Sequence, residues 1–313
     1  MNNKFWKIIF SVVILFFVLN VTGQRINNVR NAAMRGDVDS QYNLGYYYYL
    51  GSGVTKNLTQ AVFWWRRAAN HGNIRAQFNL GNCYFTGEGV SIDFEQAAYW
   101  WRRAAVRGHL FAQYNLGLCY YNGNGVTQDL DQTVYWWRLA ASSGFPKAQF
   151  NLGRCYHSGE GVDTDLSLAV FWWQLAAEQE HTGAQSHLGL SYYSGSGIPR
   201  NFNMAVFWWR KAATQGDASA QFYLGNSYYN GEGIDKNVMQ ALYWWRLAAE
   251  NGDERAQLSL DNHFEDEKSL KNRYLSNFGL VIASITILSV IFILIYTLGN
   301  AQLMRQRYSK RHR

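Results

Sequence analysis

The chain has 313 residues, of which 48% are hydrophobic and 17% aromatic, so it can bury a core and global disorder is excluded. Its net charge of +7 comes from the two ends, because Lys4 and Lys7 contribute two positive charges and residues 305–313 contribute five, while residues 8–298 are neutral. Nucleic-acid binders carry their basic surplus on the folded domain; we therefore expect no nucleic-acid partner.

Residues 1–23 have the pattern of a secretory signal. Lys4 and Lys7 precede an apolar run of twelve residues, Ile8–Leu19, and Val21 and Gly23 suit the −3 and −1 positions of a cleavage site. As a helix this run would span only about 18 Å, less than the roughly 30 Å of a bilayer core. We predict a signal peptide over 1–23, with an uncleaved anchor as the alternative.

The middle of the chain repeats one unit six times. Paired Trp residues recur every 36 residues, and Leu-Gly, Ala-Ala and Gly-x-Gly sequences share the period. A fixed period of this length is typical of a repeat array in which stacked neighbours bury a shared core. The predicted core of the array contains twelve indoles, those of Trp64, Trp65, Trp100, Trp101, Trp136, Trp137, Trp172, Trp173, Trp208, Trp209, Trp244 and Trp245.

Each unit contains two predicted helices. In residues 73–108, Ala76 and Leu80 begin an apolar stripe at helical spacing, and Gly87 supplies the backbone freedom that a helix C-terminus needs. A second helix follows Asp93 and carries the Trp pair. The residue at the Asp93 position is Asn or Asp in all six units, which are the preferred helix N-caps; these predicted caps are Asn57, Asp93, Asp129, Asp165, Asn201 and Asn237.

Departures from the repeat predict local differences. Glu180 replaces the Gly that closes the second helix in the other units, which predicts a longer or reshaped turn. Half-units flank the array: Ile26–Gly36 is predicted to be a lone second helix and Asp253–Phe264 a lone first helix. In the latter, Asp261 replaces the Gly of Leu-Gly, so we expect no close neighbour there. The predicted solenoid covers 24–264 and is all-α.

The C-terminal part predicts a membrane anchor. After a juxtamembrane linker at 265–277, we predict a transmembrane helix over 278–298, because Gly279–Leu298 contains twenty uncharged residues, the length that crosses a bilayer. The tail, 299–313, has five Lys or Arg residues and no acid. The positive-inside rule places it in the cytoplasm and the repeats on the extracytoplasmic or lumenal side of a single-pass membrane protein.

The sequence offers no pattern for catalysis, a metal or a cofactor, and we expect none. The Gly-x-Gly loops lack the strand, third Gly and Lys of phosphate-binding loops. Cys83, Cys119 and Cys155 fall in the same position of successive units, too far apart for a disulfide, and are predicted to be buried packing residues. The seven His residues show no metal-ligand spacing and are predicted to lie exposed in loops, although His181 and His187 could meet near the fourth turn.

Two rows of residues are candidate surfaces. One lies on the first helices, and its amides could bond an extended peptide backbone or simply be solvated: Asn43, Asn79, Asn115 and Asn151, continued by His187 and Tyr223. The other precedes each Trp pair and is either an exposed apolar strip or packs on the adjacent unit: Phe63, Tyr99, Tyr135, Phe171, Phe207 and Tyr243. Asn57 is both a predicted helix cap and the acceptor of an N-glycosylation sequon.

The repeated alternation of Ala-x-x-x-Leu-Gly-x-x-Tyr, Gly-x-Gly-Val and Ala-x-x-Trp-Trp-Arg-x-Ala-Ala resembles the Sel1-like repeat family over about residues 26–263. The resemblance implies an α/α solenoid, related to tetratricopeptide repeats, whose first helices line the concave side. It also implies a non-catalytic scaffold, so the Asn row is the candidate site for a protein partner.

Together these features predict a membrane-anchored adaptor that binds another protein. In a eukaryote the layout resembles the lumenal adaptors of ER-associated degradation. In a bacterium, an envelope protein in host interaction is the alternative. A competing class is a cell-wall or β-lactam hydrolase, an activity ascribed to a cysteine-rich branch of the family whose paired cysteines this chain lacks.

Overall fold

The computed structural model describes the backbone of residues 24–311 and the side chains of residues 24–291 and 293. The predicted signal peptide, 1–23, lies outside the described residues. All regular structure within 24–311 is helical, which confirms the all-α prediction. A helix over 24–34 is followed by α2 (Val38–Leu50), α3 (Leu58–Asn70), α4 (Ile74–Thr86), α5 (Phe94–Ala105), α6 (Leu110–Asn122), α7 (Leu130–Ser142), α8 (Pro146–Ser158), α9 (Leu166–Glu178), α10 (Thr182–Ser194), α11 (Phe202–Thr214), α12 (Ala218–Asn230), α13 (Val238–Glu250) and α14 (Glu254–Arg311).

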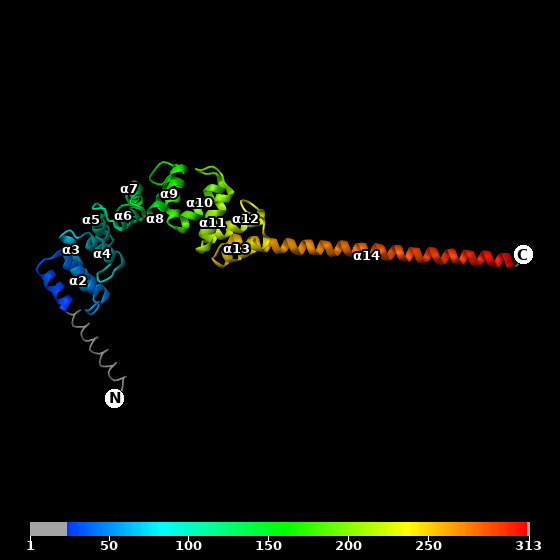
Figure 1. Cartoon of the computed structure of the whole chain (residues 1–313), viewed down its shortest axis with the longest axis horizontal. Helices are drawn as coiled ribbons and strands as arrows, with labels where there is room; N and C mark the ends of the chain where they lie inside the picture. The colour runs from blue at the N-terminus through cyan, green and yellow to red at the C-terminus, as the bar shows by residue number, and fades with distance from the viewer. Residues whose placement is uncertain (1–23, 312–313) are drawn as a thin grey trace, which may run out of the picture.

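Helices α2 to α13 form six hairpins, each made of an even-numbered first helix and an odd-numbered second helix. Each helix packs on its hairpin partner and on the next helix in the chain. The stacked hairpins form a curved solenoid, from which α14 projects as a long straight rod (Figure 1). Along α2 to α9 the first helices lie on the inner side of the curve (Figure 1), and first helices α10 and α12 also contact each other.

The predicted N-caps are confirmed in all six second helices. In each, the Asn or Asp side chain accepts a hydrogen bond from the backbone N–H three residues on, at 2.9–3.1 Å. Such a cap satisfies one of the four N–H groups that a helix start leaves unpaired. The first helices end at a Gly in the left-handed conformation, as Gly87 does with a φ of 80°.

The two indoles of each Trp pair have different neighbours. Trp101 packs on Gly81 of its own unit, where an added Cβ would lie 2.5 Å from the indole Cδ1. Trp100, in contrast, belongs to an apolar cluster that spans two units, since it includes Leu80 of its own unit and Trp65 of the preceding one. One indole therefore closes the hairpin and the other joins neighbouring hairpins, so the pair explains both the hairpin and its stacking.

The predicted longer or reshaped turn after α9 is wrong. Three residues separate α9 from α10, as three separate α3 from α4. Glu180 adopts a φ of 64°, in the left-handed region where the equivalent Gly72 has a φ of 86°. The packing of both flanking helices fixes the turn, and Glu180 takes the strained conformation that a glycine adopts elsewhere.

The last half-unit continues into the rest of the chain. Leu260 is buried against α13, as predicted for a terminal first helix. The segment expected to be a linker, 265–277, is helical, so the half-unit and the apolar segment belong to one helix of 58 residues. Among the described residues, only this helix contains a stretch long and apolar enough to cross a membrane, and no part of that stretch is buried against the rest of the chain.

Candidate functional site

The Asn row lies on the first helices, with a one-unit spacing between neighbouring members. Asn43 is exposed, and Asn79, Asn115 and Asn151 are half-buried. Among the described residues, Asn151 donates a long hydrogen bond of 3.5 Å to the Tyr114 hydroxyl. The side chains of the other three make no hydrogen bond to a described residue, so their amides are free to bond a ligand.

The last two members of the row differ from the asparagines. The His187 ring lies 4.9 Å from the indole of Trp173, and the Tyr223 ring is stacked on the indole of Trp209 with centroids 5.0 Å apart. In addition, His187 Nδ1 lies 2.9 Å from the carbonyl oxygen of Gly183. These two rings are packed side chains, so the row divides into an amide half and an aromatic half.

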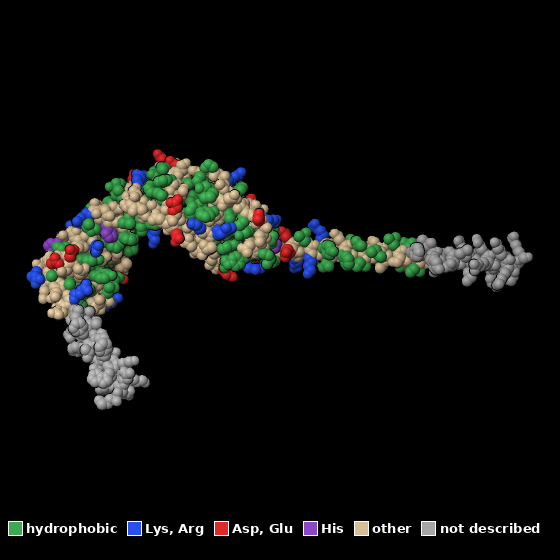
Figure 2. All heavy atoms as spheres, in the orientation of Figure 1, with side chains coloured by type: hydrophobic (Ala, Val, Ile, Leu, Met, Phe, Trp, Pro, Cys, Tyr) green, Lys and Arg blue, Asp and Glu red, His purple; other side chains and the backbone are tan. Residues whose placement is uncertain are grey.

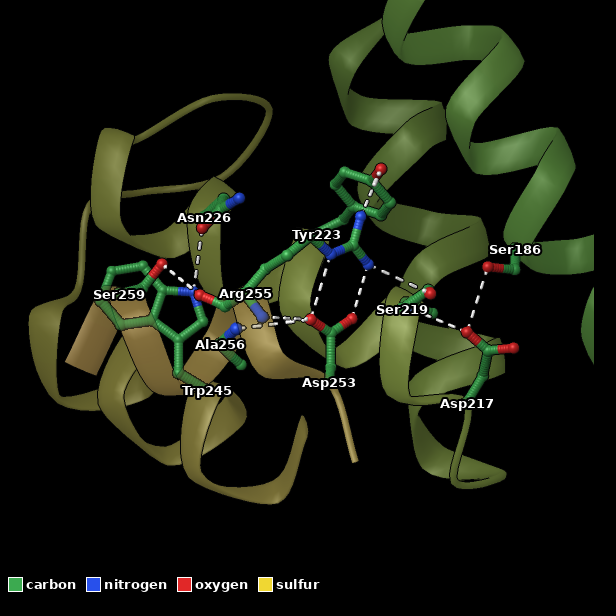
Figure 3. Close-up of polar contacts among 11 residues, drawn as sticks. Ser186, Asp217, Ser219, Tyr223, Asn226, Trp245, Asp253, Arg255, Ala256 and Ser259 are labelled. Carbon is green, nitrogen blue, oxygen red and sulfur yellow. Dashed lines mark hydrogen bonds and ion pairs between the residues drawn. The ribbon is translucent and has the colours of Figure 1, made fainter. Parts of the chain in front are cut away.

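Arg255 fixes the aromatic half of the row to the start of α14 (Figure 3). Its guanidinium donates to the hydroxyl oxygens of Tyr223 at 3.1 Å and Ser219 at 3.2 Å, and it pairs with Asp253 at 2.5 Å. Burial by itself raises the pKa of Asp253, but the bonds from Arg255 outweigh it and hold that pKa below its usual value. Asp253 also caps α14, so the start of the long helix is tied to first helix α12.

A pocket of about 180 Å³ opens between first helices α4 and α6, in the amide half of the row. Another depression, of about 690 Å³, lies near the N-terminal ends of α2 and α4 and includes Asn43. The residues around the smaller pocket are Asn82, Phe85, Thr86, Trp101, Asn115, Leu118, Cys119, Asn122 and Asn124.

The aromatic row before each Trp pair is half exposed. Its side chains are 44–51% accessible, and each ring meets the first indole of its Trp pair edge to face. Basic side chains lie over three of these rings, such as Arg103 over Tyr99 at 5.9 Å. The exposed alternative therefore holds in part, because about half of each ring faces solvent. The indole that each ring contacts belongs to its own helix and not to the adjacent unit, as the other alternative expected. Apolar side chains also gather on the visible surface over the array (Figure 2).

The prediction that the histidines lie exposed in loops is wrong for five of the six in the described residues. Four are half-buried, namely His109, His181, His187 and His263, and His157 is exposed but lies within helix α8. His109 and His181 are half-buried N-caps, whose Nδ1 atoms accept from the N–H of Ala112 at 3.3 Å and of Ala184 at 3.2 Å. Burial lowers the pKa of His109, His181 and His187, and nearby basic side chains lower it further. His181 and His187 meet on the ring of Phe150, on which both pack, but no hydrogen bond joins them.

The three cysteines are buried and unpaired, as predicted. Burial raises the pKa of the Cys83 and Cys119 thiols to about 12 and that of Cys155 to about 11. Thiols with such pKa values are poor nucleophiles. Within the described residues there is also no group of three His, Cys, Asp or Glu side chains placed to hold a metal ion.

Comparisons with known proteins agree on the repeats. A family model described as the Sel1 repeat matches residues 38–73, 74–109, 110–145, 146–181, 182–217 and 218–253. A solved protective antigen of uropathogenic Escherichia coli strains that displays an SLR fold is 39% identical over 77% of this chain, with a TM-score of 0.72. A solved Sel1 repeat protein from Oxalobacter formigenes is 31% identical over 75% of this chain, with a TM-score of 0.62.

The chain matches 52% of the length of the E. coli structure and 94% of the Oxalobacter structure. A comparison with curated protein sequences returned no match.

Proposed function

The chain belongs to the Sel1-repeat family, and from that premise we propose that it is a non-catalytic, membrane-anchored scaffold that binds another protein through the amide half of its first-helix row. The observation that carries this proposal is the set of unbonded amides at one position of successive first helices, on Asn43, Asn79 and Asn115. Main-chain groups of an extended segment need donors and acceptors at regular intervals, and amide side chains supply both.

Two observations support a membrane anchor. No described side chain of the apolar stretch of α14, residues 279–291 and 293, is buried, and α14 is one helix from the solenoid onward. In water such a surface is unfavourable, whereas lipid solvates it and the helix satisfies its own backbone hydrogen bonds. We propose that residues 278–298 cross a membrane, with the repeats outside the cytosol and the basic tail inside.

The relatives favour a bacterial envelope over the endoplasmic reticulum. The two solved proteins described above, which share more than 30% identity with this chain, come from bacteria, and one is described as a protective antigen. We therefore propose that this chain displays its repeats at the cell surface or in the envelope, where the partner is a protein of the envelope or of a host. The larger size of that antigen means that its role reaches this chain only as a proposal.

Affinity capture tests the proposal. The full chain in detergent is compared with the triple variant Asn79→Ala, Asn115→Ala, Asn151→Ala, and captured proteins are identified by mass spectrometry. We expect the triple variant to keep its helical content and lose its partners. A folded triple variant that captures the same partners undiminished contradicts the proposal, and turnover of a cell-wall or β-lactam substrate by the pure protein favours the enzyme alternative.

A further inference from the structure

The pocket between α4 and α6 has an apolar floor and a rim of amides. Trp101 and Cys119 form the floor, since they are only 3% and 2% exposed. Phe85 and Leu118 line its walls, and the amide-bearing side chains are more accessible than the floor. The rim consists of Asn82, Asn115, Asn122 and Asn124.

Two later units fill the equivalent position with a ring of their own. Asn115, His187 and Tyr223 are equivalent positions of the repeat, and each faces the second indole of the preceding unit. Where the residue is His or Tyr, its ring lies about 5 Å from that indole. Asn115 is too short to do so, which leaves the space above Trp101 open. The chain itself therefore demonstrates that a ring fits this kind of site.

The size of the pocket excludes a cofactor and suits one side chain. An apolar cavity of about 150 Å³ holds a benzene molecule, whereas small-molecule sites usually exceed about 300 Å³. At about 180 Å³, this pocket accommodates a side chain the size of leucine or phenylalanine.

The lining of the pocket selects an uncharged apolar group. No charged residue lines it, so a charged group would lose its hydration without gaining a partner. A sugar ring needs an exposed aromatic face on which to stack, and because Trp101 is almost completely buried, only the wall residue Phe85, which is 37% exposed, offers one. The rim suits a peptide backbone: Asn82 accepts the indole N–H of Trp101 at 3.1 Å, which leaves its amide N–H groups to donate, and the Asn115 amide makes no bond to a described residue.

We infer that this pocket receives one large apolar side chain from an extended segment of a protein partner, while the amides of Asn82 and Asn115 bond the backbone on either side of it. This inference rests on the proposed function and narrows it to a particular anchor between the second and third units. Burial of one such side chain is the kind of contact that dominates the affinity of an interface.

The test uses the full chain in lipid nanodiscs and a phage library of random twelve-residue peptides as the probe. The variant Asn115→Tyr fills the pocket with the residue that the chain already carries at Tyr223. Leu118→Arg places a charge in the pocket, and Arg154 is the equivalent residue one unit later. Both replacements therefore occur naturally in this repeat, and circular dichroism checks that each variant folds. Ser142→Tyr adds a ring at an exposed position of second helix α7, outside both the Asn row and the pocket, and serves as the control.

We expect the wild type to enrich peptides that share one leucine- or phenylalanine-sized residue. Asn115→Tyr and Leu118→Arg should each lower the affinity for those peptides at least tenfold, and Ser142→Tyr should lower it less than twofold. If the peptides bind Asn115→Tyr as tightly as the wild type, the inference about the pocket is overturned. It is also overturned if the enriched peptides share a charged residue instead of an apolar one.

Failure of the pocket and failure of the proposed function are distinguishable. If peptides keep their affinity for Asn115→Tyr but lose it when Asn79 and Asn151 become Ala, the row binds protein and the pocket is wrong. If the library yields no binder, the inference that the pocket receives a peptide side chain is also overturned. The affinity capture of folded partners then tests the proposed function independently. The wild type is also tested on a glycan array. If it binds a glycan and Asn115→Tyr abolishes that binding, the ligand is a glycan and the inference that it is a peptide is overturned.

Discussion

The contact between Gly153 and Trp173 sets the spacing of the helices in the fourth unit, and Gly153→Ala tests it. An added Cβ would lie 2.5 Å from both Cδ1 and Nε1 of the Trp173 indole and 3.1 Å from the carbonyl oxygen of Ala169. The indole is itself fixed, because it is buried and donates to the carbonyl oxygen of Phe150 at 3.2 Å. The ring therefore cannot make room without disturbing its neighbours.

Two opposing effects set the size of the change. Overpacking of a core lowers the free energy of unfolding by about 1–3 kcal/mol. The upper value applies because the added Cβ would overlap two atoms of a ring that cannot move. Replacing a helical Gly with Ala stabilises the helix by about 1 kcal/mol. The variant should therefore lose about 2 kcal/mol. With the ring removed by Trp173→Ala, the same replacement should gain about 1 kcal/mol, so the two positions are coupled by about 3 kcal/mol.

Native-state thiol labelling measures this locally. Cys155 lies on the same helix as Gly153, is buried, and becomes reactive only when its unit opens; Cys83, two units away, is the internal control. Gly153→Ala should speed labelling of Cys155 about thirtyfold, and should slow it about fivefold in the Trp173→Ala background. An equal effect in both backgrounds would refute the contact as the cause.

Three further predictions concern the turns and caps. Glu180→Gly should raise the free energy of unfolding by about 1 kcal/mol in urea titrations, and Gly216→Glu, at the equivalent turn, should lower it similarly. Because the pKa values of His109 and His181 are lowered in the folded chain, their stabilising contribution is complete above about pH 6.5 and is lost as the pH falls below it. The melting temperature should therefore fall between pH 7.5 and pH 5, and it should fall less in the double variant His109→Asn, His181→Asp. Asp129→Ala removes a cap and should cost about 1 kcal/mol by urea titration, with no loss indicating that the bond at 2.9 Å contributes nothing.

The helical hairpins and their stacking could be predicted from the sequence, because the residues that specify them act locally and recur in six units. The N-caps illustrate this: an Asn or Asp before an amphipathic stretch needs only its own backbone to form the bond, as Asp93 does with Gln96 at 3.0 Å. The Leu-Gly and Trp-Trp positions share one period, so their contact could also be anticipated. Because the caps, the glycines and the apolar pattern all favour the same hairpin, the sequence specifies a single fold.

The errors arise where tertiary packing overrides a local signal. Glu180 disfavours a left-handed backbone, yet the two helices around it are held by the same contacts as in other units, so the turn is unchanged. His109 and His181 occupy the cap position that Asn73 and Asp217 hold elsewhere. Aligning the units would have revealed these two caps, since imidazole Nδ1 is also an acceptor.

The division of the Asn row could not be predicted from the row alone. Whether a residue there binds or packs depends on the distance to an indole about fourteen residues earlier in the chain, as for Tyr223 and Trp209. That distance is set by helix stacking rather than by local sequence. The pocket above Trp101 follows from the same cause, because it forms where a short side chain meets a position built for a ring.

Site-specific photo-crosslinking tests the central claim most directly. A photoreactive residue is placed at Asn115 on the inner row or at Tyr135 on the half-exposed outer row of the neighbouring helix, and the full chain is irradiated in its native membrane. The account predicts partner adducts from position 115 and none from position 135. Adducts that form from position 135 alone would contradict it, because the partner would then bind the second helices.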